Sequence, residues 1–393
     1  MRITEVKTWI VSVPFRFPET WRDGQRSGIN NVVIRLATDE GLEGWGEASS
    51  NSGGSVEVTD AIVRSFIPFL VGVDPHQIEG TVARFYGAAR WGHHRVAANA
   101  ALAGVEMAMW DLVGKAANQP VSSLIGGALR ESVSAYGNVT HDDDPQAMAD
   151  AARRWVDAGH DVIYVNAGQG LERDVAVVEA IRGAIGPDVR LRVDAGEAWT
   201  VAEAVNTIRR LEEFRLDFVE QPVRADDLDG MALLRRRLAT PIAANQSTWT
   251  VQNVYNVVAH GAADVVVIGL HWLGGILAFR KAAAIAEAAN IPVCRHSSGE
   301  LGVATAAGLQ VLAVVPNQVD GHQTYYSHLA DDIIVGDEVH LHGGRQTVPT
   351  APGLGVTVDP DKLKQYSRAY SDNGPYRAYS LDGTQLVSGF GKR

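Results

Sequence analysis

The chain has 393 residues, of which 46% are hydrophobic and 21% are charged, and its formal net charge at pH 7 is -11. This composition is ordinary for a globular enzyme, and the length allows one large barrel and a second domain. The negative charge argues against nucleic acid or an anionic membrane as the main partner. The lone cysteine, Cys294, excludes an intrachain disulfide and is typical of a reducing cytoplasm.

The sequence begins directly with an apparent strand, without the basic and apolar regions of a secretion signal. No run of 18 apolar residues is present, so no membrane span is expected. These features predict a cytoplasmic protein.

Three antiparallel strands are predicted in the first 50 residues, at 6–13, 31–36 and 44–47. A polar segment, Phe15 to Gly28, separates the first two strands and carries Arg16, Trp21, Arg22 and Arg26. A loop so rich in arginine predicts a lid that contacts an anionic ligand, and a solvated surface loop is the alternative.

Helical periodicity follows the strands, at 56–70, 76–89 and 96–117. The last of these helices is apolar nearly all round between Ala98 and Trp110, so we expect it to be buried between two domains.

The middle of the chain repeats one short unit, an apolar run that ends in a polar residue and is followed by an amphipathic helix. The run ends Asp194, Glu220 and Asn245 are spaced by the length of a β-strand, a helix and two loops. Strands that alternate with helices predict a parallel sheet, and about eight such units close into a barrel. The eight predicted strands are 132–138, 161–166, 189–194, 216–220, 241–245, 264–268, 291–296 and 319–323.

In such barrels the C-terminal ends of the strands carry the chemistry. Because neighbouring strands lie about 4.8 Å apart, Asp194, Glu220 and Asn245 can converge on one cation. Ligation by oxygen alone suits Mg²⁺ or Mn²⁺ rather than Zn²⁺. The alternative is that these side chains cap the following helices or pair with arginines. His296 ends the seventh predicted strand, and histidine titrates near neutrality, so it is a candidate acid or base.

Several short motifs are shared with one known family. They are Asp39-Glu40-Gly41 with Gly44-Trp45-Gly46-Glu47, Trp110-Asp111-Leu112-Val113-Gly114-Lys115, Leu124-Ile125-Gly126-Gly127 and Pro352-Gly353-Leu354-Gly355-Val356. With the three ligand strands, they resemble the enolase superfamily of the mandelate racemase/muconate lactonising type. Asn245 as the third metal position and His296-Ser297 after the seventh strand are similar to the glucarate dehydratase-like branch.

The resemblance implies an α/β fold, with a modified (β/α)₇β TIM-like barrel under an α+β capping domain built from the N-terminus and the C-terminal tail. The capping domain is expected at 1–127 and the barrel at 128–327, and residues 328–393 are expected to return to the capping domain. The resemblance also implies one Mg²⁺ per subunit, which stabilises the enediolate formed when a proton next to a carboxylate is removed. Members often form symmetric assemblies, so a homo-oligomer is expected.

Two positions depart from the family pattern. The second strand usually ends in two lysines separated by one residue, and here Tyr164 and Asn166 stand there. The sixth strand usually ends in Asp or Lys, and here it ends in Gly269. Without the usual acidic residue, Glu300, His271 or Asp320 must orient His296. Tyr164 can be a base if a nearby cation or arginine lowers its pKa, a hydrogen-bond donor to the substrate, or a side chain that only packs.

Together these features predict a Mg²⁺-dependent dehydratase of aldarates or aldonates that forms a 2-keto-3-deoxy acid. His296 is the first choice for the acid and a possible base, and Tyr164 is the second choice for the base. The alternatives are a racemase or epimerase that uses both residues on opposite faces of the substrate, and a catalytically silent ligand-binding protein. Residues expected to contact the carboxylate substrate are Asn166, Arg16, Trp21, Arg22, His271, Glu300 and Tyr325.

Overall fold

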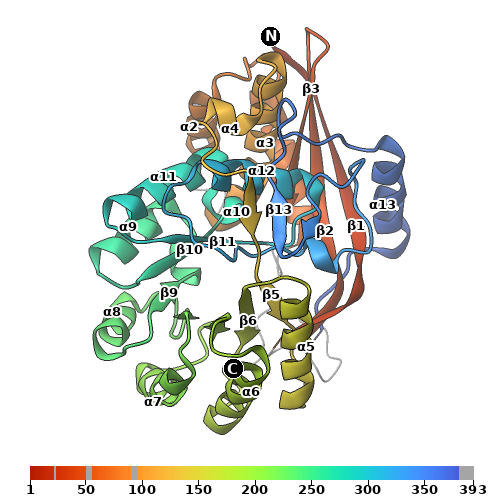
Figure 1. Cartoon of the computed structure of the whole chain (residues 1–393). Coiled ribbons are helices and arrows are strands. Elements are labelled where there is room, and N and C mark those ends of the chain that lie inside the picture. Colours follow the sequence, from red (N-terminus) through yellow and green to blue (C-terminus); the bar gives the residue numbers. More distant parts are fainter. Residues whose placement is uncertain (22–23, 50–54, 90–94, 380–393) are drawn as a thin grey trace.

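The computed structural model describes residues 1–21, 24–49, 55–89 and 95–379. An antiparallel sheet with helices packs beside a barrel of parallel strands and helices (Figure 1). The predicted α/β architecture, a TIM-like barrel with a capping unit of strands and helices, is therefore confirmed.

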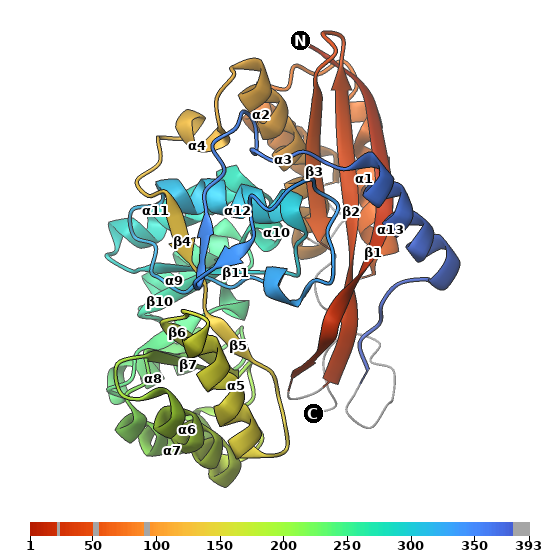
Figure 2. The ribbon, with the colours of Figure 1, turned by 45° about the vertical axis from the view of Figure 1, so that its right-hand side comes forward.

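The capping sheet has three antiparallel strands, β1 (Ile3–Trp21), β2 (Gly24–Thr38) and β3 (Glu43–Ser49), in that spatial order. The three predicted strands are confirmed, but β1 and β2 are much longer than expected. Both run from the end of the molecule that holds the N-terminus to the level of the barrel strands (Figure 2).

The polar segment Phe15 to Gly28 is not a loop, and this expectation was wrong. Most of it continues the β1–β2 ladder, in which Glu19 pairs with Arg26 and Trp21 with Gly24, beyond a register shift between Pro14 and Glu19. Local polarity suggested a loop because each strand here exposes part of its polar surface, whereas the cross-strand pairing that stabilises the hairpin cannot be read from either strand alone.

The capping helices are α1 (Val56–Phe66), α2 (Ile78–Ala89) and α3 (Arg95–Ala116), with the short helix η1 (Ile67–Phe69) after α1. As predicted, α3 is buried between sheet and barrel, since it packs against β3 and against α10 (Leu270–Leu273). Glycines allow the close approach to β3, because a Cβ atom at Gly46 would lie 1.9 Å from the carbonyl oxygen of Gly104.

Seven parallel strands form the curved barrel sheet, in chain order: β5 (Gly137–Val139), β6 (Val162–Asn166), β7 (Arg190–Asp194), β8 (Phe218–Glu220), β9 (Ile242–Ala244), β10 (Val265–Gly269) and β11 (Val293–His296). The segment around 318–323 closes the gap between the two edge strands. Val319 donates its N–H to Val293 on one side, and Tyr136 donates to His322 on the other. The predicted eighth strand thus consists of isolated bridges.

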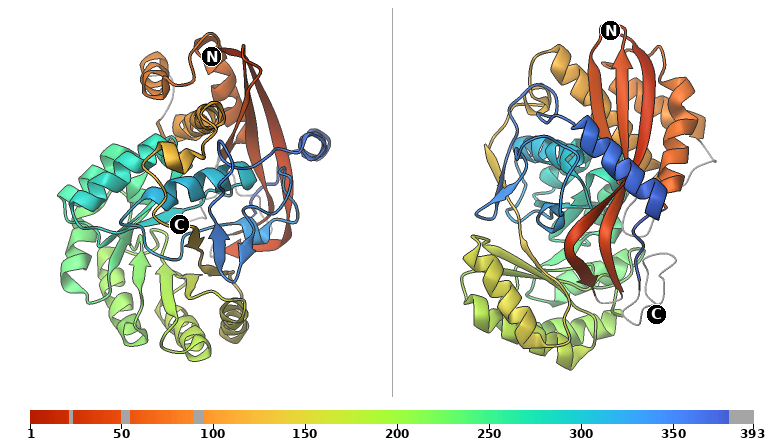
Figure 3. Two further views of the ribbon diagram at one scale, coloured as in Figure 1. Left: turned by 45° about the horizontal axis from the view of Figure 1, so that its top comes forward. Right: turned by 90° about the vertical axis from the view of Figure 1, so that its right-hand side faces the viewer.

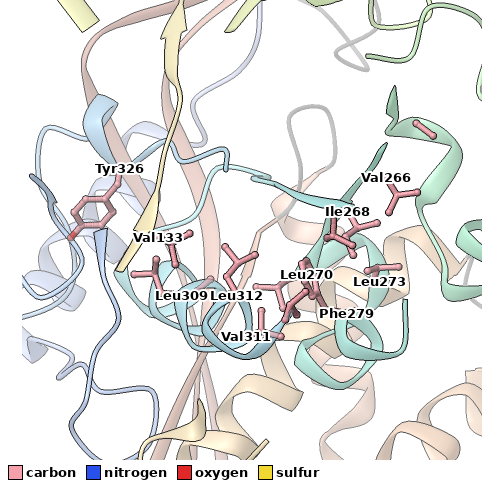
Figure 4. Close-up of a cluster of buried hydrophobic side chains, with 14 of the residues drawn as sticks. Val133, Val266, Ile268, Leu270, Leu273, Phe279, Leu309, Val311, Leu312 and Tyr326 are labelled. Carbon is pink, nitrogen blue, oxygen red and sulfur yellow. The ribbon is translucent and has the colours of Figure 1, made fainter. Parts of the chain in front are cut away.

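Helices precede, connect and follow the barrel strands, and most of them cover the outside of the barrel. They are α4 (Val121–Leu124), α5 (Pro145–Asp157), α6 (Leu171–Ile185), α7 (Val201–Leu211), η2 (Glu212–Phe214), α8 (Leu228–Arg237), η3 (Gln246–Thr248), α9 (Val251–Ala259), α10, α11 (Ile276–Ala288), α12 (Gly302–Val314) and η4 (Tyr326–His328). Helix α12 is almost completely buried, and Figure 4 shows its residues Leu309, Val311 and Leu312 in one cluster with Ile268 and Leu270.

The C-terminal part contacts both units. Strands β12 (Leu341–His342) and β13 (Arg345–Thr347) form a small sheet with β4 (Ser132–Ser134), next to the barrel. Helix α13 (Pro360–Asn373) then packs against β1, across the outer side of the capping sheet (Figure 3). The chain ends its described part beside the hairpin, where Tyr379 bridges Gln25.

Candidate functional site

The register of the barrel strands brings the predicted rim residues to one edge. Asp194 lies beside Asn166 of β6 on one side and beside Glu220 of β8 on the other. Glu220 pairs with Ala243, two residues before Asn245, and His296 pairs with Gly269. Because the strands are parallel, their carboxyl ends share this edge.

A cavity of about 1000 Å³ opens at this edge between the barrel and the β1–β2 hairpin. The residues predicted for the site that line it are Trp21, Tyr164, Asn166, Asp194, Asn245, His296 and Tyr325. The hairpin also contributes Glu19 and Arg26, and it is docked onto the barrel where His141 donates its N–H to the carbonyl oxygen of Thr20 at 2.9 Å.

Asp194 and Glu220 form a crowded pair of carboxyl groups. Glu220 is only 2% exposed, and its Oε1 has no hydrogen-bond partner among the described residues. Burial, and then the charge of Asp194, raise the pKa of Glu220 well above its usual range. Nδ2 of Asn245 donates a hydrogen bond of 3.1 Å to the carbonyl oxygen of Val267. The side-chain oxygen Oδ1 therefore points away from this bond and can be a metal ligand.

This donor set fits a divalent cation, because the half-buried carboxyl group of Asp194, the buried carboxyl group of Glu220 and the carboxamide oxygen of Asn245 are ligands that Mg²⁺ accepts. The described part of the chain holds no group of three His, Cys, Asp or Glu side chains suited to a metal. The third predicted ligand, Asn245, belongs to none of these four types, so this finding does not conflict with the predicted set.

Tyr164 is held between a ring and a carboxylate. Its ring stacks on Tyr136 at 4.4 Å with an interplanar angle of 2°, and its hydroxyl donates a hydrogen bond of 2.7 Å to Asp194. Burial, and then the negative charge of Asp194, raise the pKa of Tyr164 well above its usual value. In this geometry Tyr164 donates to Asp194, whereas the donor role that the sequence left open was toward the substrate.

His296 lies flat against Trp272, with ring centroids 3.9 Å apart. Burial lowers the pKa of His296 to about 3, so the imidazole is neutral near pH 7. Its Nδ1 is buried without a hydrogen-bond partner among the described residues. A Cβ atom at Gly269 would lie 3.7 Å from this nitrogen, so the missing side chain at position 269 leaves it unpaired.

Within the described part of the chain, none of the three residues expected to orient His296 forms a hydrogen bond with it. Glu300 accepts from Ser298 at 2.9 Å and lies 3.3 Å from Arg295. His271 faces the carbonyl oxygen of Glu47 at 2.9 Å, and Asp320 lies 3.8 Å from Arg190.

Some residues expected to bind substrate are not among those that line the cavity. His271 and Glu300 are 0% and 2% exposed and lie behind the rim, 3.6 Å apart. Although burial alone would raise it, the charge of Arg295 lowers the pKa of Glu300. Arg16 donates its Nε hydrogen to Leu329 at 2.8 Å instead of reaching the cavity. Arg22 lies outside the described residues.

Sequence reasoning did not indicate Glu19 or Gln323 as lining residues, and it indicated Arg26 only as one of the arginines of the expected loop. Arg26 donates its Nε hydrogen to Glu19 at 2.7 Å, and both side chains are buried. The available signal was the opposite charge of two residues placed symmetrically about the hairpin turn, which becomes visible only when the segment is read as paired strands.

Two family models match the chain. Residues 3–126 match the N-terminal domain of mandelate racemase/muconate lactonizing enzymes, and residues 147–362 match the enolase C-terminal domain-like family. The chain belongs to the mandelate racemase/muconate lactonizing enzyme family of the enolase superfamily. The resemblance seen in the sequence motifs is therefore confirmed.

Known members of this family that are similar to the chain differ in reaction. D-galactarolactone cycloisomerase of Agrobacterium fabrum is 30% identical, over 93% of this chain and 99% of that protein. Arabinonate dehydratase of Saccharolobus solfataricus is 31% identical, over 85% of this chain and 90% of that protein. The crystal structure of dipeptide epimerase from Enterococcus faecalis, complexed with Mg and the dipeptide L-Leu-L-Tyr, has 28% identity and a TM-score of 0.85 and covers 91% of this chain and 100% of that one.

Family membership thus identifies an enzyme superfamily but not one reaction. No helix within the described ranges is both long enough and apolar enough to cross a membrane.

Proposed function

We propose that the chain is a Mg²⁺-dependent dehydratase that removes water from an acid sugar and releases a 2-keto-3-deoxy acid. The observation that carries this proposal is the asymmetry of the cavity. A neutral imidazole, His296, lines it at the end of β11, whereas the opposite rim at the end of β6 offers Tyr164 and Asn166, and no lysine is among the lining residues.

Asp194, Glu220 and Asn245 would hold the cation, which supplies positive charge next to the substrate carboxylate when bound. His296 would take the proton from the carbon next to that carboxylate. The electron pair of this C–H bond forms a carbon–carbon double bond as the neighbouring C–O bond breaks. The imidazolium of His296 then gives its proton to the departing hydroxyl, which leaves as water, and the enol product rearranges to the keto acid.

Elimination is favoured over racemisation because racemisation needs a proton donor and acceptor on each face of the substrate. The hydroxyl group of Tyr164 is already bound to Asp194, so only the side of His296 offers an imidazole nitrogen that can take the proton. Elimination needs one such group together with the cation. The arabinonate dehydratase among the relatives supports this reading.

Opening of a sugar-acid lactone is the second candidate. The related galactarolactone cycloisomerase matches along 99% of its length. In a lactone the ring oxygen can occupy the position of the departing hydroxyl, so one base would serve the same bond changes, with a carboxylate as the leaving group.

A library of aldonates, aldarates and their lactones tests the proposal. Purified protein with Mg²⁺ should form keto acid from at least one open-chain member, and His296→Asn should lower kcat by about 10²–10⁴-fold. Proton exchange in D₂O without keto acid would instead indicate an epimerase, and lactone consumption alone would indicate the second candidate. Ligand-induced thermal stabilisation with neither exchange nor product would indicate a silent binding protein. A symmetric homo-oligomer also stays a prediction, which light scattering tests.

A further inference from the structure

The wall of the cavity that the β1–β2 hairpin provides holds a buried ion pair that the proposed mechanism does not use. Glu19 and Arg26 are opposite each other in the strand register, with Nε of Arg26 2.7 Å from Oε2 of Glu19. They are only 6% and 7% exposed, yet both line the cavity. The pair is therefore a polar feature built into the substrate site from the capping unit.

Arg26 retains an unused hydrogen-bond donor. Its Nη2 is buried and has no hydrogen-bond partner among the described residues. The guanidinium group lies beside two stacked rings, 5.5 Å from the centre of Phe15 and 5.0 Å from that of Tyr325, and these contacts help to hold it in place. A buried donor without an acceptor is costly, and a ligand oxygen that enters the cavity would remove that cost.

The pair lies on the same side of the cavity as His296. Gln323 lies between the two, because its Oε1 accepts the N–H of Ser297 at 2.9 Å and its Nε2 donates to the hydroxyl of Tyr325 at 3.4 Å. Since the predicted metal ligands end β7, β8 and β9, a substrate whose carboxylate is at the metal would extend past His296 toward Glu19 and Arg26.

The charges of the cavity lining limit which group the substrate can carry at the end remote from the metal. Glu19 neutralises Arg26, so the pair does not attract an anion as an isolated arginine would. Among the described residues, the lining also carries the carboxylates of Asp194, Glu197, Glu203 and Asp227 and the cation of Arg224. Even with the two charges of Mg²⁺ added, this described part of the lining stays net negative. A second substrate carboxylate would meet this field and Glu19 directly.

We propose that the Glu19–Arg26 pair binds a hydroxyl group at the far end of the substrate and thereby selects aldonates, with one carboxylate, over aldarates, with two. A hydroxyl can accept a hydrogen bond from Nη2 of Arg26 and donate one to a Glu19 oxygen, whereas a carboxylate can only accept. This proposal rests on the proposed function, because it names the substrate class of that same cavity.

Matched acids that differ only at the terminal carbon test the proposal. The pairs are D-gluconate with D-glucarate, and D-galactonate with galactarate. Binding is measured in the presence of Mg²⁺ as thermal stabilisation of His296→Asn, so the result does not depend on turnover. At least one aldonate should bind about tenfold or more tightly than its aldarate partner. Equal binding within both pairs, or preference for the aldarates, would overturn the proposal. Aldonate binding without keto acid from the unmodified enzyme would refute the proposed function but not this selection.

Glu19→Gln gives the sharper result, because it leaves the positive charge of Arg26 uncompensated. The ratio of aldonate to aldarate affinity should shift by about tenfold or more toward the aldarate. Two controls remove one negative charge elsewhere, Glu203→Gln at another part of the cavity lining and Glu213→Gln on the exposed surface. If Glu203→Gln shifts the ratio as much as Glu19→Gln, the general field of the cavity selects the substrate and the pair does not.

A third variant tests the geometry. Arg26→Lys keeps the charge but loses the planar group that carries the unpaired nitrogen Nη2, so aldonate affinity should fall about tenfold while the aldarate gains nothing. Where a single change unfolds the hairpin, the double variant Glu19→Gln with Arg26→Gln leaves no unpaired buried charge. This variant should bind both acids of a pair alike, and retained selectivity in it would contradict the assignment.

Discussion

The hydroxyl group of Tyr164 donates its hydrogen bond to Oδ2 of Asp194, so the end of β6 is tied to the predicted metal ligand on β7. Tyr164→Phe keeps the ring on Tyr136 and deletes only this donor. We expect kcat to fall by about tenfold, the usual cost of one hydrogen bond to a charged group, and the Mg²⁺ concentration for half-maximal activity to change. Steady-state kinetics at varied Mg²⁺ measures both.

His296→Asn is the comparison for that experiment. If Tyr164 were the base, Tyr164→Phe would cost as many powers of ten in kcat as His296→Asn, and a loss of that size would contradict its assignment as a positioning donor.

Gly269 controls the environment of His296. Its backbone angles, φ -116° and ψ 142°, are open to any residue, and the nearest atoms to an added Cβ are 3.5–3.7 Å away. Gly269→Asp should place a carboxylate near Nδ1 and raise the pKa of His296. Because the base acts when unprotonated, a higher pKa moves the acidic limb of kcat/KM to higher pH.

The wild-type profile should show no acidic limb near pH 6.5, because burial lowers the pKa of His296 to about 3. Gly269→Asn is the matched control, because its side chain has the same shape as that of Asp but no charge. The acidic limb of its profile should lie at the same pH as in the wild type. Identical profiles for the Asp and Asn variants would show that position 269 does not act on the titration of His296.

Glu220 makes the metal-free protein less stable. A folded-state pKa above that of the unfolded chain means that ionisation of Glu220 at neutral pH disfavours folding, and burial and Asp194 both raise this pKa. Glu220→Gln removes the charge. The thermal midpoint without metal should therefore rise by roughly 2 °C or more, while the stabilisation by added Mg²⁺ should disappear.

Scanning calorimetry with EDTA and with Mg²⁺ measures both effects. The surface variant Glu213→Gln should change neither. If Mg²⁺ stabilises the Glu220→Gln protein as much as the wild type, Glu220 is not a metal ligand.

Glu106, which is not among the residues that line the cavity, makes the free energy of unfolding depend on pH. Its carboxyl accepts from the N–H groups of Ile276 and Leu277, both at 2.9 Å, at the start of α11. Burial nevertheless raises its pKa from 4.5 to about 7. The folded state thus binds this proton more tightly than the unfolded chain, so the contribution is fully present below pH 4.5 and is lost as pH rises through 7, by up to about 3 kcal/mol.

Urea unfolding between pH 4.5 and 8 checks this expectation. The free energy of unfolding of Glu106→Gln, which carries no titrating group there, should fall less with rising pH than that of the wild type. Parallel curves for the two proteins would contradict the raised pKa. Glu47, whose pKa burial also raises to about 7, remains in both proteins and sets the common background.

The sequence by itself determined the barrel and its reactive edge. Strand-length apolar runs, each closed by a polar residue, set where β7, β8 and β9 end, and parallel pairing then places Asp194 beside Glu220. This follows from local periodicity, because neighbouring strands in a βαβ unit are joined by short connections and have little freedom of register.

Only the tertiary structure decided what faces that edge. The hairpin that was read as a loop reaches the cavity through contacts with segments more than a hundred residues away, such as Thr20 with His141. The same packing brings Glu19 and Arg26 to the cavity lining and leaves His271 and Glu300 out of it. Both sets consist of polar, titratable side chains, so residue type alone does not separate them. The difference lies in which surfaces meet, and that depends on the burial of apolar area over the whole chain rather than on any local pattern.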